Sequence, residues 1–174
     1  MRVFYYFLIG VILFYIDTVI GLIIPMHIGN KDIIFVPHLT LMYLLIICVF
    51  RSFGVSIILA IVLGAITDLY FGSFYGLYLF GYILLVVIMD FFFKVFYRDN
   101  SMLFLIILLS TVVMEVYVAL IYSVLGLVQF MFIDFILLRL IPTIILNLIL
   151  LIMLYPLITK FFRKTQLKID TNQR

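Results

Sequence analysis

The sequence predicts an all-α integral membrane protein, a single bundle of six transmembrane helices with both termini in the cytoplasm. Three observations lead to this prediction. The 174 residues are 68% hydrophobic and 11% charged, whereas a soluble domain is about half apolar and about a quarter charged. Six apolar segments are long enough to cross a bilayer. Lysine and arginine are also divided unequally between the two sides that six spans define.

About 20 apolar residues cross the bilayer core as a helix. Within a few residues, six segments meet this length: 3–24, 35–50, 53–71, 74–93, 102–125 and 135–158. We expect the first to be retained, because its apolar run is longer than a signal-peptide core and shows no small-residue cleavage site. The expected organisation is one transmembrane domain over residues 1–159 and a basic cytoplasmic tail over residues 160–174.

The distribution of basic residues sets the orientation. With six spans, one side of the membrane receives only Lys31 and Arg139. The other side receives the nine remaining basic residues: Arg2, Arg51, Lys94, Arg98, Lys160, Arg163, Lys164, Lys168 and Arg174. Because basic residues accumulate on the cytoplasmic side, both termini are expected there.

Acidic residues recur late in the outward-running segments. Asp17, Asp68 and Glu115 each fall roughly 5–15 Å below the outer boundary, at 1.5 Å of rise per residue. The sixth segment runs inward and begins with Asp134, and Arg139 follows about a turn later. Intramembrane ionisable residues usually face the bundle interior and pair with one another. We therefore expect Arg139 to contact one or more of these carboxylates.

A purely structural interpretation of these acids stays open. Asp68 and Asp134 are close enough to helix ends to reach interfacial water, and Asp134 is placed to N-cap the sixth helix. Asp17 and Glu115 lie deeper, where a packed polar contact is favoured. That contact serves structure as readily as function.

The segment GAITDLYFGSFYG, residues 64–76, predicts a tight helical hairpin with a carboxylate near its tip. Gly64 and Asp68 are four residues apart and therefore share a helix face. Small residues let neighbouring helices approach closely in lipid. Gly72 is expected to end the third helix and Ser73 to cap the fourth, while Gly76 thins one side of the fourth helix.

The sixth segment has a second polar feature, Pro142 followed by Asn147. Proline removes one helical hydrogen bond, which is tolerated in a membrane when a neighbour satisfies the freed carbonyl. Asn147 falls near the middle of the membrane, where its amide needs a partner. A packing role is favoured for both residues.

Catalysis finds no support in the sequence. There is no GxSxG, no HExxH, no glycine-rich phosphate loop and no CxxC. The single cysteine, Cys48, excludes a disulfide framework, and no Cys/His cluster has metal-ligand spacing. We expect no enzyme activity, no cofactor and no nucleic-acid partner. The lipid bilayer is the expected environment.

These residues resemble the MreD family of bacterial rod shape-determining membrane proteins. The resemblance spans nearly the whole chain and rests on three features. These are the proline-initiated second helix VPHLTLMYLL, the hairpin pattern of Gly64, Asp68, Gly72 and Gly76, and the late P-T-x-x-x-N pattern of Pro142, Thr143 and Asn147. The chain is richer in Phe, Ile and Tyr than many members, which leaves the motif intact.

The resemblance implies a non-enzymatic component of the cell-elongation machinery in the plasma membrane. Family members partner MreC, a bitopic protein. Through MreC they connect to MreB filaments and to the peptidoglycan synthase pair of RodA and a class B penicillin-binding protein. The family fold is similar to the six-helix substrate-binding subunits of energy-coupling-factor vitamin transporters.

Two functional hypotheses follow. In the first, the outer-half acids and the Gly64–Gly76 hairpin build a rigid polar-lined surface beside which a transmembrane helix of MreC docks. In the alternative, the chain is a vitamin-binding transporter subunit, with an outward cavity lined by Asp17, Asp68, Glu115 and Arg139. The bulky first helix, VFYYFLIGVILF, counts against the alternative, because that class usually has small residues there for docking on the energising subunit.

Overall fold

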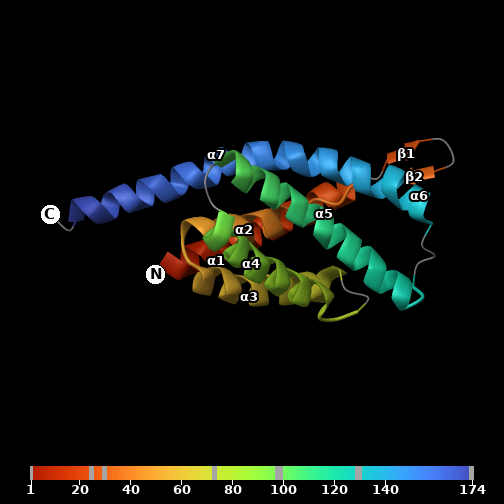
Figure 1. The fold of residues 1–174 in the computed structure, drawn as a ribbon, viewed down its shortest axis with the longest axis horizontal. Coiled ribbons are helices and arrows are strands. Elements are labelled where there is room, and N and C mark those ends of the chain that lie inside the picture. Colours follow the sequence, from red (N-terminus) through yellow and green to blue (C-terminus); the bar gives the residue numbers. More distant parts are fainter. Residues whose placement is uncertain are drawn as a thin grey trace.

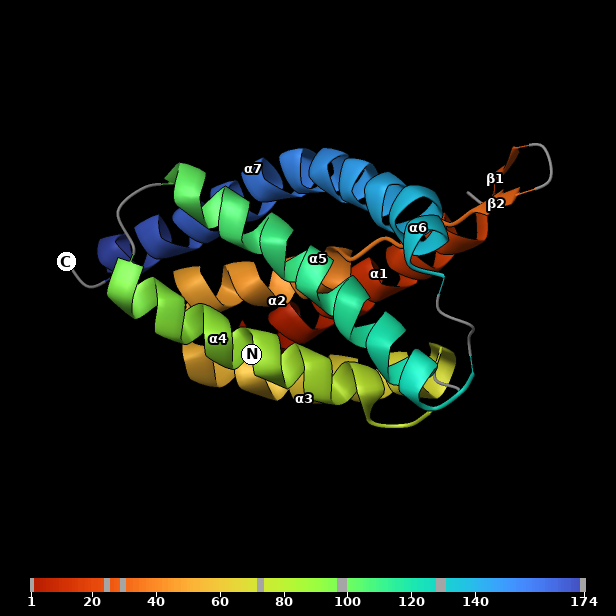
Figure 2. The same cartoon turned by 45° about the vertical axis from the view of Figure 1, so that its right-hand side comes forward.

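The computed structural model of the chain is a helical bundle (Figures 1 and 2). The residues that the structure describes are 2–23, 26–28, 31–71, 74–96, 100–127 and 131–172. Gly72 and Ser73, the predicted end of the third helix and cap of the fourth, lie outside them.

The elements follow one another in the order α1 (Arg2–Ile23), β1 (Met26–Ile28), β2 (Lys31–Ile33), α2 (Leu39–Phe50), α3 (Phe53–Phe71), α4 (Leu77–Phe96), α5 (Asn100–Val124), α6 (Phe132–Phe135), η1 (Ile136–Leu140) and α7 (Ile141–Asn172). Strands β1 and β2 form a short antiparallel ribbon. It projects from one end of the bundle, and both chain termini lie at the other end (Figure 1). Helix α6, the π-helical turn η1 and helix α7 run on as one rod, so the described elements match the six predicted segments.

Four of the described helical stretches are long and apolar enough to cross a membrane: Phe4–Ile23, Phe53–Phe71, Met102–Val124 and Phe132–Ile158. Two apolar stretches are shorter, Leu39–Phe50 and Leu77–Phe92. Many apolar side chains on the long helices are exposed on the outside of the bundle, as lipid-facing residues are. This arrangement suits an integral membrane protein.

Helix α2 is the centre of the bundle. It contacts α1, α3, α4, α5 and α7, and residues 41–47 are at most 1% exposed. A helix that is apolar on every face belongs in such an interior position. Its 12 residues rise only about 18 Å, less than the roughly 30 Å of a bilayer core.

The second helix was expected over about residues 35–50, to within a few residues, and the structure sets its start at Leu39. The chain is non-helical over residues 34–38, and α2 begins at Leu39. The physical reason is Pro37, which disfavours the helical conformation for Val36 before it. A count of apolar residues alone places the start too early, because residues 33–36 are all apolar.

Helices α3 and α4 form the predicted hairpin, and Gly64 is the residue that lets them approach. A Cβ at Gly64 would lie 2.7 Å from Cα of Leu79, closer than real side chains come. Helix α4 begins at Leu77 rather than at 74, after a turn in which Gly76 has a φ of +96°. Such a positive φ strains any residue with a side chain.

The last helix is longer than expected. Helix α7 continues to Asn172, so the backbone stays helical across the predicted boundary at residue 159. The division into a transmembrane domain over 1–159 and a tail over 160–174 stays a prediction.

Replacing Gly64 by Ala is expected to destabilise the protein by about 1–3 kcal/mol, the usual cost of forcing extra atoms into a packed interior. The measurement is thermal unfolding of the purified protein in mild detergent. Gly54→Ala is the matched control, because a Cβ there meets nothing within 4 Å and alanine favours the helix. A Gly64→Ala protein as stable as the Gly54→Ala protein would contradict this view of the hairpin.

Candidate functional site

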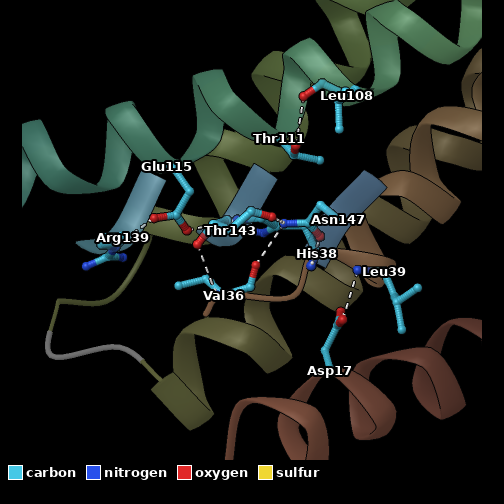
Figure 3. A network of polar contacts seen from close by, with 10 residues as sticks. All are labelled: Asp17, Val36, His38, Leu39, Leu108, Thr111, Glu115, Arg139, Thr143 and Asn147. Atoms are coloured by element: carbon cyan, nitrogen blue, oxygen red, sulfur yellow. Dashed lines mark hydrogen bonds and ion pairs between the residues drawn. The ribbon is translucent and has the colours of Figure 1, made fainter. Parts of the chain in front are cut away.

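Asp17 of α1 supports the start of α2. Its Oδ1 accepts a hydrogen bond from the backbone N–H of Leu39 at 2.8 Å. Its Oδ2 accepts one from the N–H of Thr40 at 2.8 Å and one from the Thr40 hydroxyl at 2.7 Å. The first N–H groups of a helix have no partner within the helix, so this buried carboxylate acts as a cap supplied by a different helix (Figure 3).

Asn147 and Thr143 of α7 hold the non-helical segment before α2. The Asn147 Oδ1 accepts from the N–H of His38 at 2.9 Å, and its Nδ2 donates to the carbonyls of Val36 and Thr143, both at 2.9 Å. The Thr143 hydroxyl accepts from the N–H of Val36 at 3.2 Å. Asn147 is fully buried. Its amide therefore replaces the helical hydrogen bonds that this stretch of backbone lacks.

Pro142 contributes through the hydrogen bond that it cannot make. A residue in its place would donate its N–H to the carbonyl of Leu138, four residues earlier. In the structure, that carbonyl accepts from the N–H of Ile34 at 2.9 Å. The expectation that a neighbour satisfies the freed carbonyl is confirmed, and the π-helical turn η1 (Ile136–Leu140) lies directly before the proline.

Glu115 of α5 joins two further elements. Its Oε1 is 2.9 Å from Nε2 of His38, and its Oε2 accepts from Nε of Arg139 at 2.7 Å. Glu115 is 1% exposed and the Arg139 side chain 24%. The predicted contact between Arg139 and a carboxylate is thus present. Figure 3 shows how these contacts converge on the chain just before α2.

Asp68 of α3 caps a second helix in the same manner. Its Oδ2 accepts from the N–H groups of Gly76 and Leu79, both at 3.0 Å, and its Oδ1 accepts from the N–H of Tyr78 at 2.8 Å. Asp68 is 3% exposed, so it does not point into interfacial water. Helices α1 and α3 therefore each carry an acid that caps the helix following it in the chain.

We call the seven residues around the start of α2 the outer polar network: Asp17, His38, Thr40, Glu115, Arg139, Thr143 and Asn147. It brings together four predicted site residues, namely Asp17, Glu115, Arg139 and Asn147. Asp68 serves the separate start of α4. Asp134 lies partly exposed in the first turn of α6. The residue at the N-cap position of α6 is Met131, so Asp134 lies in the first turn of the helix and not at the N-cap position, where it was expected.

Sequence reasoning did not assign site roles to His38, Thr40 or Thr143. The available signal was local: a proline directly before His38, a threonine two residues later, and the four-residue spacing of Thr143 and Asn147 on one helix face. These features mark a helix start and a polar stripe. Neither reveals that the two lie side by side, since α2 and α7 are far apart in the chain.

A cavity of about 270 Å³ lies beside the outer polar network. It is lined by parts of α1, the segment 34–38, α3 and α4, and by Arg139. Of the four ionisable residues expected to line such a cavity, Asp17 and Arg139 do so. Asp68 and Glu115 are not among its lining residues.

The chemistry of the outer polar network is mainly that of holding helices together. Both carboxylates accept hydrogen bonds from backbone or side-chain donors. Among the residues that the structure describes, no group of three or more His, Cys, Asp or Glu residues is placed to hold a metal ion.

Fold and site together define a polytopic membrane protein in which buried polar side chains bond the helices to one another. Residues 1–165 match the family model described as rod shape-determining protein MreD. The chain therefore belongs to the MreD family, a family of membrane proteins that determine rod shape. Searches of curated proteins and of solved structures find no match.

Replacing Asp68 by Ala is expected to destabilise the protein, because three N–H groups lose their acceptor and each buried donor left unpaired costs about 1–3 kcal/mol. Asp68→Asn keeps one acceptor oxygen, so its stability to unfolding is expected to lie between that of Asp68→Ala and that of the native protein. Leu69→Ala is the control, since the neighbouring Leu69 is 74% exposed. Unfolding in detergent is the measurement, and equal stability of Asp68→Ala and Leu69→Ala would refute the capping role.

The Glu115–Arg139 contact is expected to appear as energetic coupling in a double-mutant cycle. Glu115→Gln leaves Arg139 without its counter-charge inside the bundle. Arg139→Gln should therefore lower the free energy of unfolding less in the Glu115→Gln protein than in the native protein. Contacting residues show couplings of about 0.5–3 kcal/mol. Additive effects on unfolding in detergent would show that the ion pair does not form in the folded protein.

Proposed function

We propose that this chain is a non-enzymatic scaffold of the bacterial cell-elongation machinery, located in the plasma membrane. In this proposal it binds MreC and through it helps regulate peptidoglycan synthesis and cell shape. Membership of the MreD family supports the proposal. Contacts with MreB, RodA and the class B penicillin-binding protein would be indirect, through MreC.

The observation that carries the proposal is that the polar side chains within the bundle bond its helices to one another. Asp17, Glu115, Arg139 and Asn147 tie α1, α5, η1 and α7 to the segment that leads into α2. Asp68 ties α3 to α4. Bonds of this kind fix helix positions, and a protein that presents a constant surface to a partner needs helices held in this way.

The expected orientation fits this proposal. Both termini lie at the same end of the bundle (Figure 1), and nine of the eleven basic residues were assigned to that side. We propose that this end is cytoplasmic. The β1–β2 ribbon would then lie at the extracytoplasmic end.

The proposed docking site needs revision at the glycines. Leu79 of α4 fills the space beside Gly64. Gly76 has open space around it, but its positive φ shows that it is needed for the turn. Both glycines serve the α3–α4 hairpin, so they leave no groove for a partner helix. We therefore place the MreC helix against one of the exposed apolar faces of the bundle.

The vitamin-transporter alternative retains one supporting observation, the cavity beside Asp17 and Arg139. Its expected lining by Asp68 and Glu115 is not met. A vitamin that raises the melting temperature of the purified protein would favour this alternative, and we expect none to do so.

Co-purification tests the docking proposal. The tagged chain is co-expressed with full-length MreC and purified in mild detergent, and MreC is expected in the eluate. One bulky substitution is made on each exposed face, at residues that are 46–57% exposed: Ile12→Trp, Ile58→Trp, Val87→Trp, Leu109→Trp and Ile149→Trp. We expect one face to lose MreC, with a rounding of rod-shaped cells, while the other four retain it.

Each variant is first checked for native melting temperature, so that a loss of MreC reports a lost surface and not a lost fold. The native chain failing to retain MreC would contradict the proposal. Retention by all five folded variants would exclude docking on these faces.

A further inference from the structure

The cavity beside the outer polar network has no part in the scaffold proposed above. At about 270 Å³ it lies just below the range for small-ligand pockets, about 300–1,000 Å³. Its walls come from five separate parts of the chain, including Phe14 of α1, Pro37 and Tyr82 of α4. A space of this size, assembled from several elements, is large enough to hold a ligand.

The mouth of the cavity is apolar and open. Leu22, Ile34 and Phe71 line it and are 68%, 46% and 46% exposed. They lie at the end of the bundle that carries the β1–β2 ribbon. Asp17, which also lines the cavity, is six residues from the end of α1, about 9 Å along the helix. The cavity therefore lies along the last turns of α1, close to the ribbon end of the bundle.

Arg139, one of the residues that line the cavity, carries hydrogen-bond donors. The oxygens of Asp17 are directed to the N–H groups that begin α2. Arg139 contacts Glu115 through Nε, and its two terminal nitrogens point away from that carboxylate (Figure 3). A guanidinium has donors and no acceptor, so its partner in the cavity must accept hydrogen bonds. A negatively charged group forms the stronger bonds of this kind.

The walls suit an alkyl chain. The rings of Phe14 and Phe71 meet edge to face with centroids 6.2 Å apart, and both line the cavity together with Leu22. A Cβ at Gly21 would meet only Cδ of Pro37, at 3.9 Å. The wall at Gly21 is therefore open, and a chain can leave the cavity past it toward the bilayer.

We propose that this cavity binds an anionic amphiphile, with its acidic head on the terminal nitrogens of Arg139 and its alkyl chain between Phe14, Leu22 and Phe71. An acidic head with an alkyl chain occurs in two sources, an anionic phospholipid of the bilayer and a free fatty acid. The proposal goes beyond the scaffold role and does not depend on MreC binding.

The test is lipid retention by the purified full-length chain, measured by native mass spectrometry and by melting temperature. The probes are phosphatidylglycerol, oleate and, as the neutral control, phosphatidylcholine. At least one acidic probe is expected to bind and to raise the melting temperature more than phosphatidylcholine does. Binding of phosphatidylglycerol alone identifies a bilayer lipid, and binding of oleate alone identifies a free acid.

Two variants separate the cavity from non-specific lipid adhesion. Gly21→Phe adds a ring at the mouth of the cavity and leaves the residues of the outer polar network unchanged. It is expected to weaken binding of the acidic probe about tenfold, equivalent to about 1.4 kcal/mol. Ile58→Phe places the same ring on an exposed apolar surface of α3 and is expected to leave binding of the acidic probe unchanged. Arg139→Gln should remove the preference for the acidic head.

Equal retention of phosphatidylcholine and both acidic probes would overturn the proposal. So would a Gly21→Phe protein that folds normally and binds the acidic probe as tightly as the native chain. If Arg139→Gln fails to fold, Gly21→Phe alone decides the outcome.

Discussion

Helix α2 begins inside the bundle, where its first N–H groups are shielded from water and must find acceptors in the protein. Much of the architecture at the ribbon end follows from this constraint. Asp17 of α1 accepts from the first two residues of the helix, and Asn147 of α7 accepts from His38 just before it. A short buried helix is possible in a membrane only when the backbone groups at its ends, which have no partner within the helix, find hydrogen-bond partners elsewhere in the protein. The acceptors must therefore come from neighbouring helices, and each such bond fixes the position of the helix that supplies it.

The same constraint accounts for residues that are otherwise costly in lipid. The proline at 142 frees the carbonyl of Leu138 for the N–H of Ile34, which helps to hold the segment leading into α2. Glu115 reaches that segment through His38 and is balanced by Arg139. The α3–α4 hairpin solves a smaller version of the problem with Asp68. The intramembrane polar groups thus form the framework on which a constant partner-binding surface, as proposed here, would rest.

Three features could be predicted from the sequence: the number of helical segments, the close approach of two helices at Gly64 and the pairing of Arg139 with a carboxylate. These depend on apolar length, on side-chain size and on the cost of a lone charge, all of which are local properties. The sequence located the start of α2 only to within a few residues, because Ile34, Phe35 and Val36 are apolar and extend the hydrophobic segment past the true helix start at Leu39. It also did not reveal what the acids bind. Asp17 and Asp68 cap helices 22 and 8–11 residues away, and such partners are chosen by tertiary packing. Asp134, which the sequence places at a helix start, lies in the first turn of α6 and not at its N-cap position.

The central claim is that the start of α2 is sealed within the bundle by Asp17. Hydrogen exchange of the backbone amides over residues 38–40, followed by mass spectrometry with the protein in a lipid nanodisc, tests it most directly. The account predicts exchange as slow as in the middle of α2, and a selective acceleration at residues 39 and 40, whose N–H groups donate to Asp17, in an Asp17→Asn protein that otherwise stays folded. Rapid exchange at these amides in the native chain, or no acceleration in the folded variant, would contradict it.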